Sequence, residues 1–311
     1  MENTRLQLKK TSSGIGYYIF AMILALNAVS VLLMVLAIIV DGSLKNPAYL
    51  LLDNIASISS MFIIGLFYCL FSKTQLNDVF PLKKISLKMA AATVTISLAL
   101  ALLANFFADL FVGGISLFGI KNYAEMDFTT NNPVEIILNI IAISIIPALS
   151  EEFAFRGIIL SKLRKYGNGF AVFISALLFG FLHGNIVQIP FAFIVGLGLA
   201  FVTIKTSSIV PAIITHFLNN LSSVIISIIE ENKLMDEEIA DGFYYLFLII
   251  VFILAVFISY KLSQKSFFNL KKYTLIPFKE RVKAVFTSSG IIVALAVILL
   301  EVILSVIPYG K

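Results

Sequence analysis

The chain consists of long apolar runs separated by short polar segments. A helix needs about 20 apolar residues to cross the hydrocarbon core of a bilayer. The segment 169–183 is short, and only Gly184 and Asn185 separate it from the next run, so it could cross fully or form a half-span or re-entrant piece. The pattern predicts an all-α, polytopic membrane helical bundle of eight or nine transmembrane helices. The predicted helices cover residues 14–40, 47–71, 88–112, 133–160, 169–183, 186–204, 208–229, 243–260 and 290–307.

The composition supports this prediction and excludes other classes of protein. Hydrophobic residues make up 59% of the chain and charged residues 13%, and the mean hydropathy is +1.00. These values exclude a soluble globular domain, a disordered chain and a fibrous repeat. The single cysteine, Cys69, excludes a disulfide framework and a Cys-based zinc site. The aqueous segments are too short to fold alone, so residues 1–311 are expected to form a single integral membrane domain.

The distribution of Lys and Arg predicts the orientation. With a cytoplasmic N-terminus and nine crossings, Arg156 lies within a span and all other Lys and Arg face the cytoplasm, except Lys45, Lys121, Lys233 and Lys311. This asymmetry predicts a multi-pass protein of the cell membrane with a cytoplasmic N-terminus, a basic cytoplasmic segment 261–289 and an acidic external segment 230–242. The positive charge therefore reflects topology, and the lipid bilayer rather than nucleic acid is the expected partner. The segment 261–289 could be a solvated loop or lie along the anionic inner leaflet.

Ionisable side chains inside spans are costly and are functional candidates. Glu151, Glu152 and Arg156 lie deep in the fourth predicted span. Glu152 and Arg156 are four residues apart and can pair on one helix face, whereas Glu151 points elsewhere. A structural ion pair between helices would explain Glu152 and Arg156 but not Glu151, which could titrate as a general base. Four other ionisable residues lie near span ends, where they can reach the interface: Asp53, Lys88, Asp109 and Glu135. Glu301 lies deeper in the last span and has no assigned role.

Two further polar clusters contain both histidines of the chain. Phe179 and His183 share a helix face, as do His216 and Asn220. Each cluster alone could be an interfacial histidine or a polar contact between helices. Together with Glu151, these side chains are the types needed to activate water and to stabilise a tetrahedral oxyanion. They are also nearly the set that a metal site needs.

The three clusters resemble the signatures of the CPBP intramembrane proteases, also called the Abi family. These signatures are Glu-Glu-x-x-x-Arg, Phe-x-x-x-His and His-x-x-x-Asn, in that order on separate membrane helices. Here they begin at Glu151, Phe179 and His216, and the resemblance covers a CPBP-like catalytic core at 133–225. It implies hydrolysis of a peptide bond in or near the membrane, as in the endopeptidases that trim prenylated CAAX proteins.

The resemblance also implies a role for each motif residue. Glu151 would activate the attacking water with help from His183, and His216 and Asn220 would stabilise the oxyanion. Glu152 and Arg156 would hold the first motif helix in place.

No cofactor is predicted, and zinc is the alternative. Two His and two Glu could form a zinc site, but one of the two Glu is expected to pair with Arg156. The chain also has no His-Glu-x-x-His motif, which is typical of zinc proteases.

The expected substrate is a membrane-associated peptide or protein. High Ile, Lys and Asn content without a eukaryotic targeting signal favours a bacterial origin, where a leader or pheromone precursor is a more plausible substrate than a CAAX protein. A non-catalytic membrane scaffold or bacteriocin-immunity protein of the same fold is the alternative function. A transporter that uses the carboxylates as a proton relay is a third hypothesis, although the polar groups cluster rather than line a path.

Overall fold

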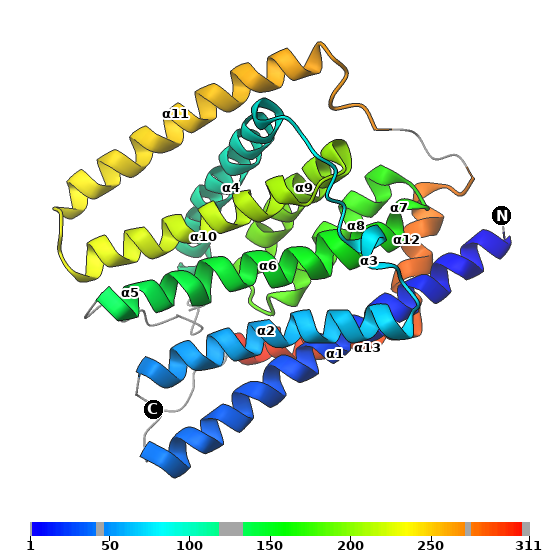
Figure 1. Cartoon of the computed structure of the whole chain (residues 1–311), viewed down its shortest axis with the longest axis horizontal. Helices are drawn as coiled ribbons and strands as arrows, with labels where there is room; N and C mark the ends of the chain where they lie inside the picture. Colours follow the sequence, from blue (N-terminus) through cyan, green and yellow to red (C-terminus); the bar gives the residue numbers. More distant parts are fainter. Residues whose placement is uncertain (1, 42–46, 118–132, 271–274, 307–311) are drawn as a thin grey trace.

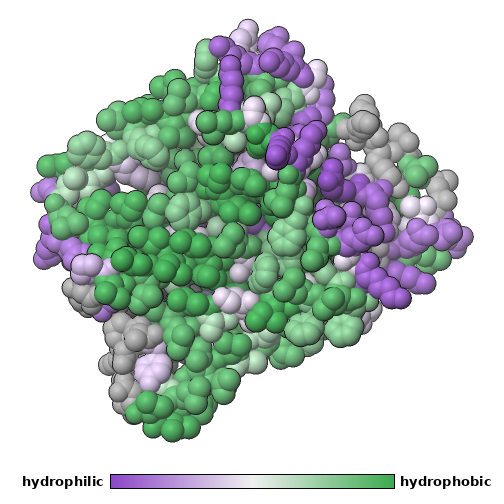
Figure 2. Space-filling view, in the orientation of Figure 1, coloured by the Kyte–Doolittle hydropathy of each residue, from purple (hydrophilic) through white to green (hydrophobic). Residues whose placement is uncertain are grey.

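The fold is a bundle of long helices (Figure 1). The computed structural model describes residues 2–41, 47–117, 133–270 and 275–306, and within these ranges no β-strand is present beyond an isolated bridge between Leu82 and Ser208. Figure 2 shows a broad apolar surface across the middle of the molecule, with polar residues gathered towards the end where the N-terminus lies. This distribution is that of a multi-pass membrane protein, and the predicted all-α bundle is confirmed.

All nine apolar runs form helices in the described ranges. Two short helices lie in segments that were predicted as connections, α3 (Leu76–Val79) and α12 (Phe278–Phe286). Residue 307, at the end of the last predicted span, lies outside the described residues. The nine runs correspond to α1 (Glu2–Asp41), α2 (Pro47–Phe71), α4 (Leu87–Ser116), the composite helix Pro133–Arg164, α8 (Asn168–Leu182), α9 (Gln188–Thr206), α10 (Val210–Glu231), α11 (Glu237–Ser263) and α13 (Ser289–Ser305).

The lower predicted number of spans agrees with the structure. Seven helices of the described part are long and apolar enough to cross a membrane, and the pair α12 and α13, bent by 68°, gives up to eight. The 15-residue helix α8 is about 22 Å long, which is shorter than a hydrocarbon core of about 30 Å. Of the alternatives for residues 169–183, the structure therefore favours the half-span.

The composite helix contains two π-helical segments on either side of the Glu-Glu pair. Its parts are α5 (Pro133–Asn139), η1 (Ile140–Ile145), α6 (Ile146–Glu152), η2 (Phe153–Ile159) and α7 (Leu160–Arg164). A change of hydrogen-bond register in a helix can release backbone carbonyls, and π-helical turns are frequent at functional sites. The carbonyls of Ile143 in η1 and Phe155 in η2 indeed accept hydrogen bonds from side chains of other helices.

The composite helix lies in the middle of the bundle, with the other helices packed around it. It contacts α2 on one side and α10 on the other, and α8 packs against η2. Helices α1, α2 and α13 form the lower layer in Figure 1, whereas α4 and α11 lie beyond α10. The main cluster of buried apolar residues draws on the composite helix, α1, α8 and α13. The motif helices are thus held by core packing on several sides.

The turn between α8 and α9 depends on Gly184, which directly follows His183. Gly184 has a φ of +57°, a conformation that residues with a side chain rarely adopt. A Cβ atom there would lie 2.9 Å from Glu301 Oε2 of α13. The other carboxylate oxygen, Glu301 Oε1, accepts a hydrogen bond of 3.0 Å from the Asn27 amide of α1. Glu301 therefore connects α1 to the turn that follows His183.

The segment 261–289 is not the plain loop of the first interpretation. Residues 278–286 form the helix α12, on which Ala284 and Val285 are buried. Arg281 of α12 donates a hydrogen bond to the carbonyl of Tyr166. The apolar face of α12 pulls it against the bundle, and this packing overrides the charge of the segment.

The two ends of the bundle agree with the predicted topology. Arg5 of α1 and Glu280 of α12 form an ion pair of 3.4 Å, so the N-terminal helix and the basic segment lie at the same end. Lys272 of the same basic segment lies outside the described residues. Which end faces the cytoplasm stays a prediction from the charge distribution.

Candidate active site

The three motifs converge on one cavity of about 350 Å³. Glu151 comes from α6, His183 from the end of α8, and His216 and Asn220 from α10. These helices turn the faces that carry these polar side chains towards the same cavity in the bundle interior. Glu152 and Arg156 do not line the cavity and lie behind it.

The buried carboxylate of Glu152 contacts two other side chains. Its side chain is 0% exposed, and Oε1 lies 2.9 Å from Arg156 Nη1, so the predicted pair is confirmed. The same oxygen lies 2.9 Å from His216 Nδ1. The four-residue spacing predicts a pair of Glu152 with Arg156 alone. The structure adds His216 and so links the first motif to the third.

Glu151 occupies a different environment from its neighbour. Its side chain is 15% exposed and lines the cavity. Among the described residues, Glu151 Oε2 has no hydrogen-bond partner, and it lies 3.9 Å from His216 Nε2. One carboxylate is thus engaged and buried, and the adjacent carboxylate faces the cavity.

The hydrogen bond to Glu152 determines the protonation of His216 Nδ1. An ionised carboxylate can only accept, so Nδ1 must donate. In a neutral imidazole Nε2 then carries a lone pair, and in an imidazolium Nε2–H is a donor on the side of Glu151.

Phe179 joins the motifs by ring contacts. Its ring centroid lies 4.3 Å from the guanidinium carbon of Arg156, within the range of a cation–π interaction. The same ring makes edge contacts with His183 at 4.9 Å and with His216 at 6.1 Å. The phenylalanine of the second motif therefore shields the buried Arg156 and fixes the positions of both histidine rings.

His183 presents one ring nitrogen for chemistry. It is the C-terminal capping residue of α8, and its Nδ1 lies 2.9 Å from the Phe179 carbonyl. A carbonyl only accepts, so Nδ1 carries the proton and Nε2 of the neutral ring is an acceptor. The adjacent turn at Gly184 holds this orientation.

Asn220 is part of a chain of amides that the sequence analysis did not find. Its Nδ2 donates to the Ile143 carbonyl at 2.9 Å, which leaves its second N–H available. Asn219 donates to Asn220 Oδ1 at 3.3 Å, and Asn105 of α4 donates to Asn219 Oδ1 at 3.3 Å. Two features of the sequence could have indicated this chain of amides. Asn105 is a lone amide in an apolar span, and Asn219 lies three residues after His216, on the same side of the helix.

The donor set does not fit a zinc site. Within the described residues, no three or more His, Cys, Asp or Glu side chains are grouped so as to hold a metal ion. Glu152 is engaged with Arg156 and with His216 Nδ1.

Comparison with known proteins agrees with the motifs. Residues 133–222 match the family model described as Rce1-like, Type II CAAX prenyl endopeptidase Rce1-like. The resemblance to the CPBP family is confirmed. The match contains all three motifs, and it ends within α10, so α11 and the helices before residue 133 lie outside it. No curated protein and no solved structure matches the chain. The Rce1-like match implies a membrane protease of the CAAX type.

Proposed function

We propose that the protein is an integral membrane endopeptidase that hydrolyses a peptide bond of a membrane-associated peptide or protein. The observation that supports this most strongly is the contrast between the two adjacent carboxylates. Glu152 is fully buried between Arg156 and His216, whereas Glu151 is 15% exposed and lines the cavity. A positioned carboxylate beside a free volume suits a general base.

In the first step, Glu151 removes a proton from a water molecule. The remaining O–H of that water donates a hydrogen bond to His183 Nε2, which orients the water. The water oxygen forms a bond to the carbonyl carbon of the substrate, and the carbonyl π electrons move to the oxygen. General-base catalysis of this kind contributes about 10²–10⁴ in rate.

The oxyanion is stabilised from α10. In the imidazolium form, His216 donates from Nε2, and Asn220 donates its second N–H. Removal of one donor of this kind costs about 10²–10³ in rate. As the tetrahedral intermediate collapses, the C–N bond breaks and the proton held by Glu151 passes to the leaving amine.

Glu152 and Arg156 act through His216. Glu152 fixes the imidazole through Nδ1, and the buried Arg156 balances the charge of Glu152. We therefore assign both as positioning residues.

The proposal is tested by comparing the peptides released by cells that carry the wild-type protein, Glu151→Gln and Glu280→Gln. Glu280 is a carboxylate of α12 at the bundle end, so its variant is a matched control. We expect peptides that appear with the wild type and the control and are absent with Glu151→Gln. Identical peptide sets in all three strains would contradict proteolysis. If deletion of the protein changes the growth of the cells and Glu151→Gln restores normal growth, the non-catalytic scaffold is favoured.

A further inference from the structure

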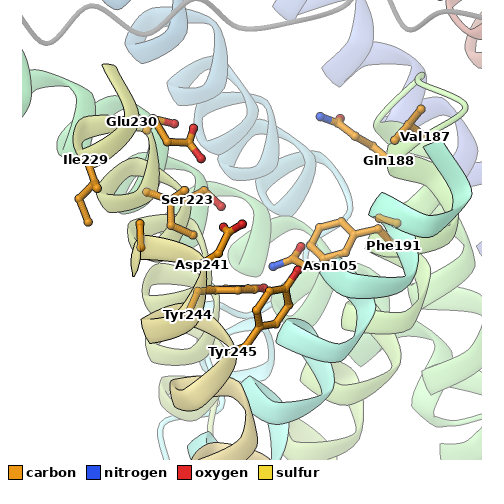
Figure 3. A pocket seen from close by; sticks show the side chains of 14 residues that line it. Asn105, Val187, Gln188, Phe191, Ser223, Ile229, Glu230, Asp241, Tyr244 and Tyr245 are labelled. Carbon is orange, nitrogen blue, oxygen red and sulfur yellow. The ribbon is translucent and has the colours of Figure 1, made fainter. Parts of the chain in front are cut away.

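A second cavity of about 520 Å³ adjoins the candidate active site. It lies between α4, α9, α10 and α11 (Figure 3). The two cavities share four lining residues, which come from three of these helices: Asn105, Gln188, Phe191 and Ser223. We call this second space the outer cavity, because it extends from the site to the end of the bundle where α10 meets α11.

The outer cavity has one acidic wall. Figure 3 shows Glu230, Ser223 and Asp241 on one side and Gln188 and Phe191 on the opposite side. In the part of the chain that the structure describes, neither Glu230 nor Asp241 forms an ion pair. Among the described residues that line the cavity, none is a lysine or arginine. Two carboxylates in a concave wall without a counter-charge create a negative potential that attracts cations.

Polar groups continue from the outer cavity to the catalytic side chains. Asn105 lines both cavities and donates to Asn219, which in turn donates to Asn220. Gln188 and Tyr245 add further hydrogen-bonding groups to the outer cavity. An extended peptide with its scissile bond at Glu151 could therefore satisfy its backbone groups along this route. The next residues of that peptide would lie beside the acidic wall.

We propose that the outer cavity binds the substrate segment adjacent to the scissile bond, and that Glu230 and Asp241 select a cationic side chain there. This inference rests on the proposed function and assigns its substrate class, a membrane peptide with Lys or Arg close to the cleaved bond. A cation beside the two carboxylates removes their mutual repulsion and gains an ion pair with each. Partly exposed pairs of this kind are screened by water, so the expected gain in affinity is about five- to tenfold.

The test uses two synthetic membrane peptides as probes. They share one apolar segment and carry polar tails that differ only in having Lys or Gln. Binding is measured by fluorescence anisotropy in detergent micelles with the full-length Glu151→Gln protein, so it does not depend on turnover. We expect the Lys peptide to bind about five- to tenfold more tightly than the Gln peptide, with a smaller preference at high salt.

Two further variants on the same background identify the residues responsible. Glu230→Gln with Asp241→Asn should abolish the preference. Glu238→Gln should keep it, because Glu238 is an exposed carboxylate of the same segment that does not line the cavity. Equal affinities for both peptides, or a preference that survives the double substitution, would overturn the inference.

Cleavage of the same peptides by the wild-type protein reports separately on the proposed function. A Lys preference in binding without any cleavage would contradict the protease assignment and support the cation-selective cavity. Cleavage of both peptides at equal efficiency would support the protease assignment and contradict the cation-selective cavity.

Discussion

His216 Nδ1 and Glu152 Oε1 lie 2.9 Å apart, although 64 positions separate the two residues. The contact explains why a second glutamate follows Glu151. Glu152 has a task of its own, because it holds His216 and Arg156 at the same time. The other nitrogen of His216 then faces Glu151 at 3.9 Å. The three motifs therefore form one unit, in which a change behind the cavity is expected to alter the groups that line it.

Loss of the buried cation should lower stability. Arg156→Met leaves Glu152 without its cationic partner in a site with 0% exposure, and breaking a buried pair costs about 3–5 kcal/mol. We expect a lower folded yield and a lower free energy of unfolding in detergent. Lys165→Met is the control, because Lys165 is exposed directly after the end of the composite helix and its substitution should change stability little. Equal stability of both variants would show that the pair does not support the fold.

Asn220→Ala should impair turnover more than substrate binding. The substitution removes an oxyanion donor, which typically costs about 10²–10³ in rate. We expect kcat to fall by this factor with little change in KM, measured on a quenched peptide substrate. The control is Asn232→Ala, which changes an exposed amide at the end of α10. A loss that appears only in KM would assign Asn220 to substrate binding instead.

Hydrolysis should persist after metal removal. A catalytic zinc site takes three protein ligands and leaves one position for water. Recruiting Glu151 as a ligand would remove the proposed base, and recruiting Glu152 would leave Arg156 unpaired. The measurement is activity after dialysis against a strong chelator, with metal content determined by mass spectrometry. Stoichiometric zinc, with activity lost on chelation and restored by zinc, would contradict the mechanism.

The N-terminus should face the cytoplasm. Single cysteines are placed at Lys233 and at Lys265 in a protein in which Cys69 is replaced by Ala, and intact cells are treated with a membrane-impermeant thiol reagent. Both positions are exposed at opposite predicted sides of the membrane. We expect labelling at 233 and none at 265 until the cells are opened. The reverse pattern would invert the topology and place the outer cavity on the cytoplasmic side.

Local rules predicted much of this molecule. The lengths of the apolar runs located every long helix, and the four-residue spacing of Glu152 and Arg156 predicted their ion pair. The same rule placed Phe179 and His183 on one face, where their rings are in contact. Each of these features lies within a single helix, so the helical repeat of 3.6 residues per turn is sufficient to predict it.

Features that depend on the packing of different helices could not be predicted in this way. The contact between His216 and Glu152 requires a particular rotation of α10 against α6, and the sequence alone does not determine that rotation. The hydrogen bond from Asn105 of α4 to Asn219 of α10 likewise depends on how two helices pack. Glu301 had no assigned role until the structure placed it between Asn27 and the turn at Gly184.

The most direct test of the central claim is proteolysis by the purified full-length protein in water enriched in ¹⁸O. The account predicts that the wild-type protein cleaves a membrane peptide and that the new carboxyl terminus carries ¹⁸O. Glu151→Gln should accumulate as a folded protein, because its side chain lies at the cavity wall rather than in the buried pair, and it should yield no cleaved product. Cleavage by Glu151→Gln at the wild-type rate would contradict the account.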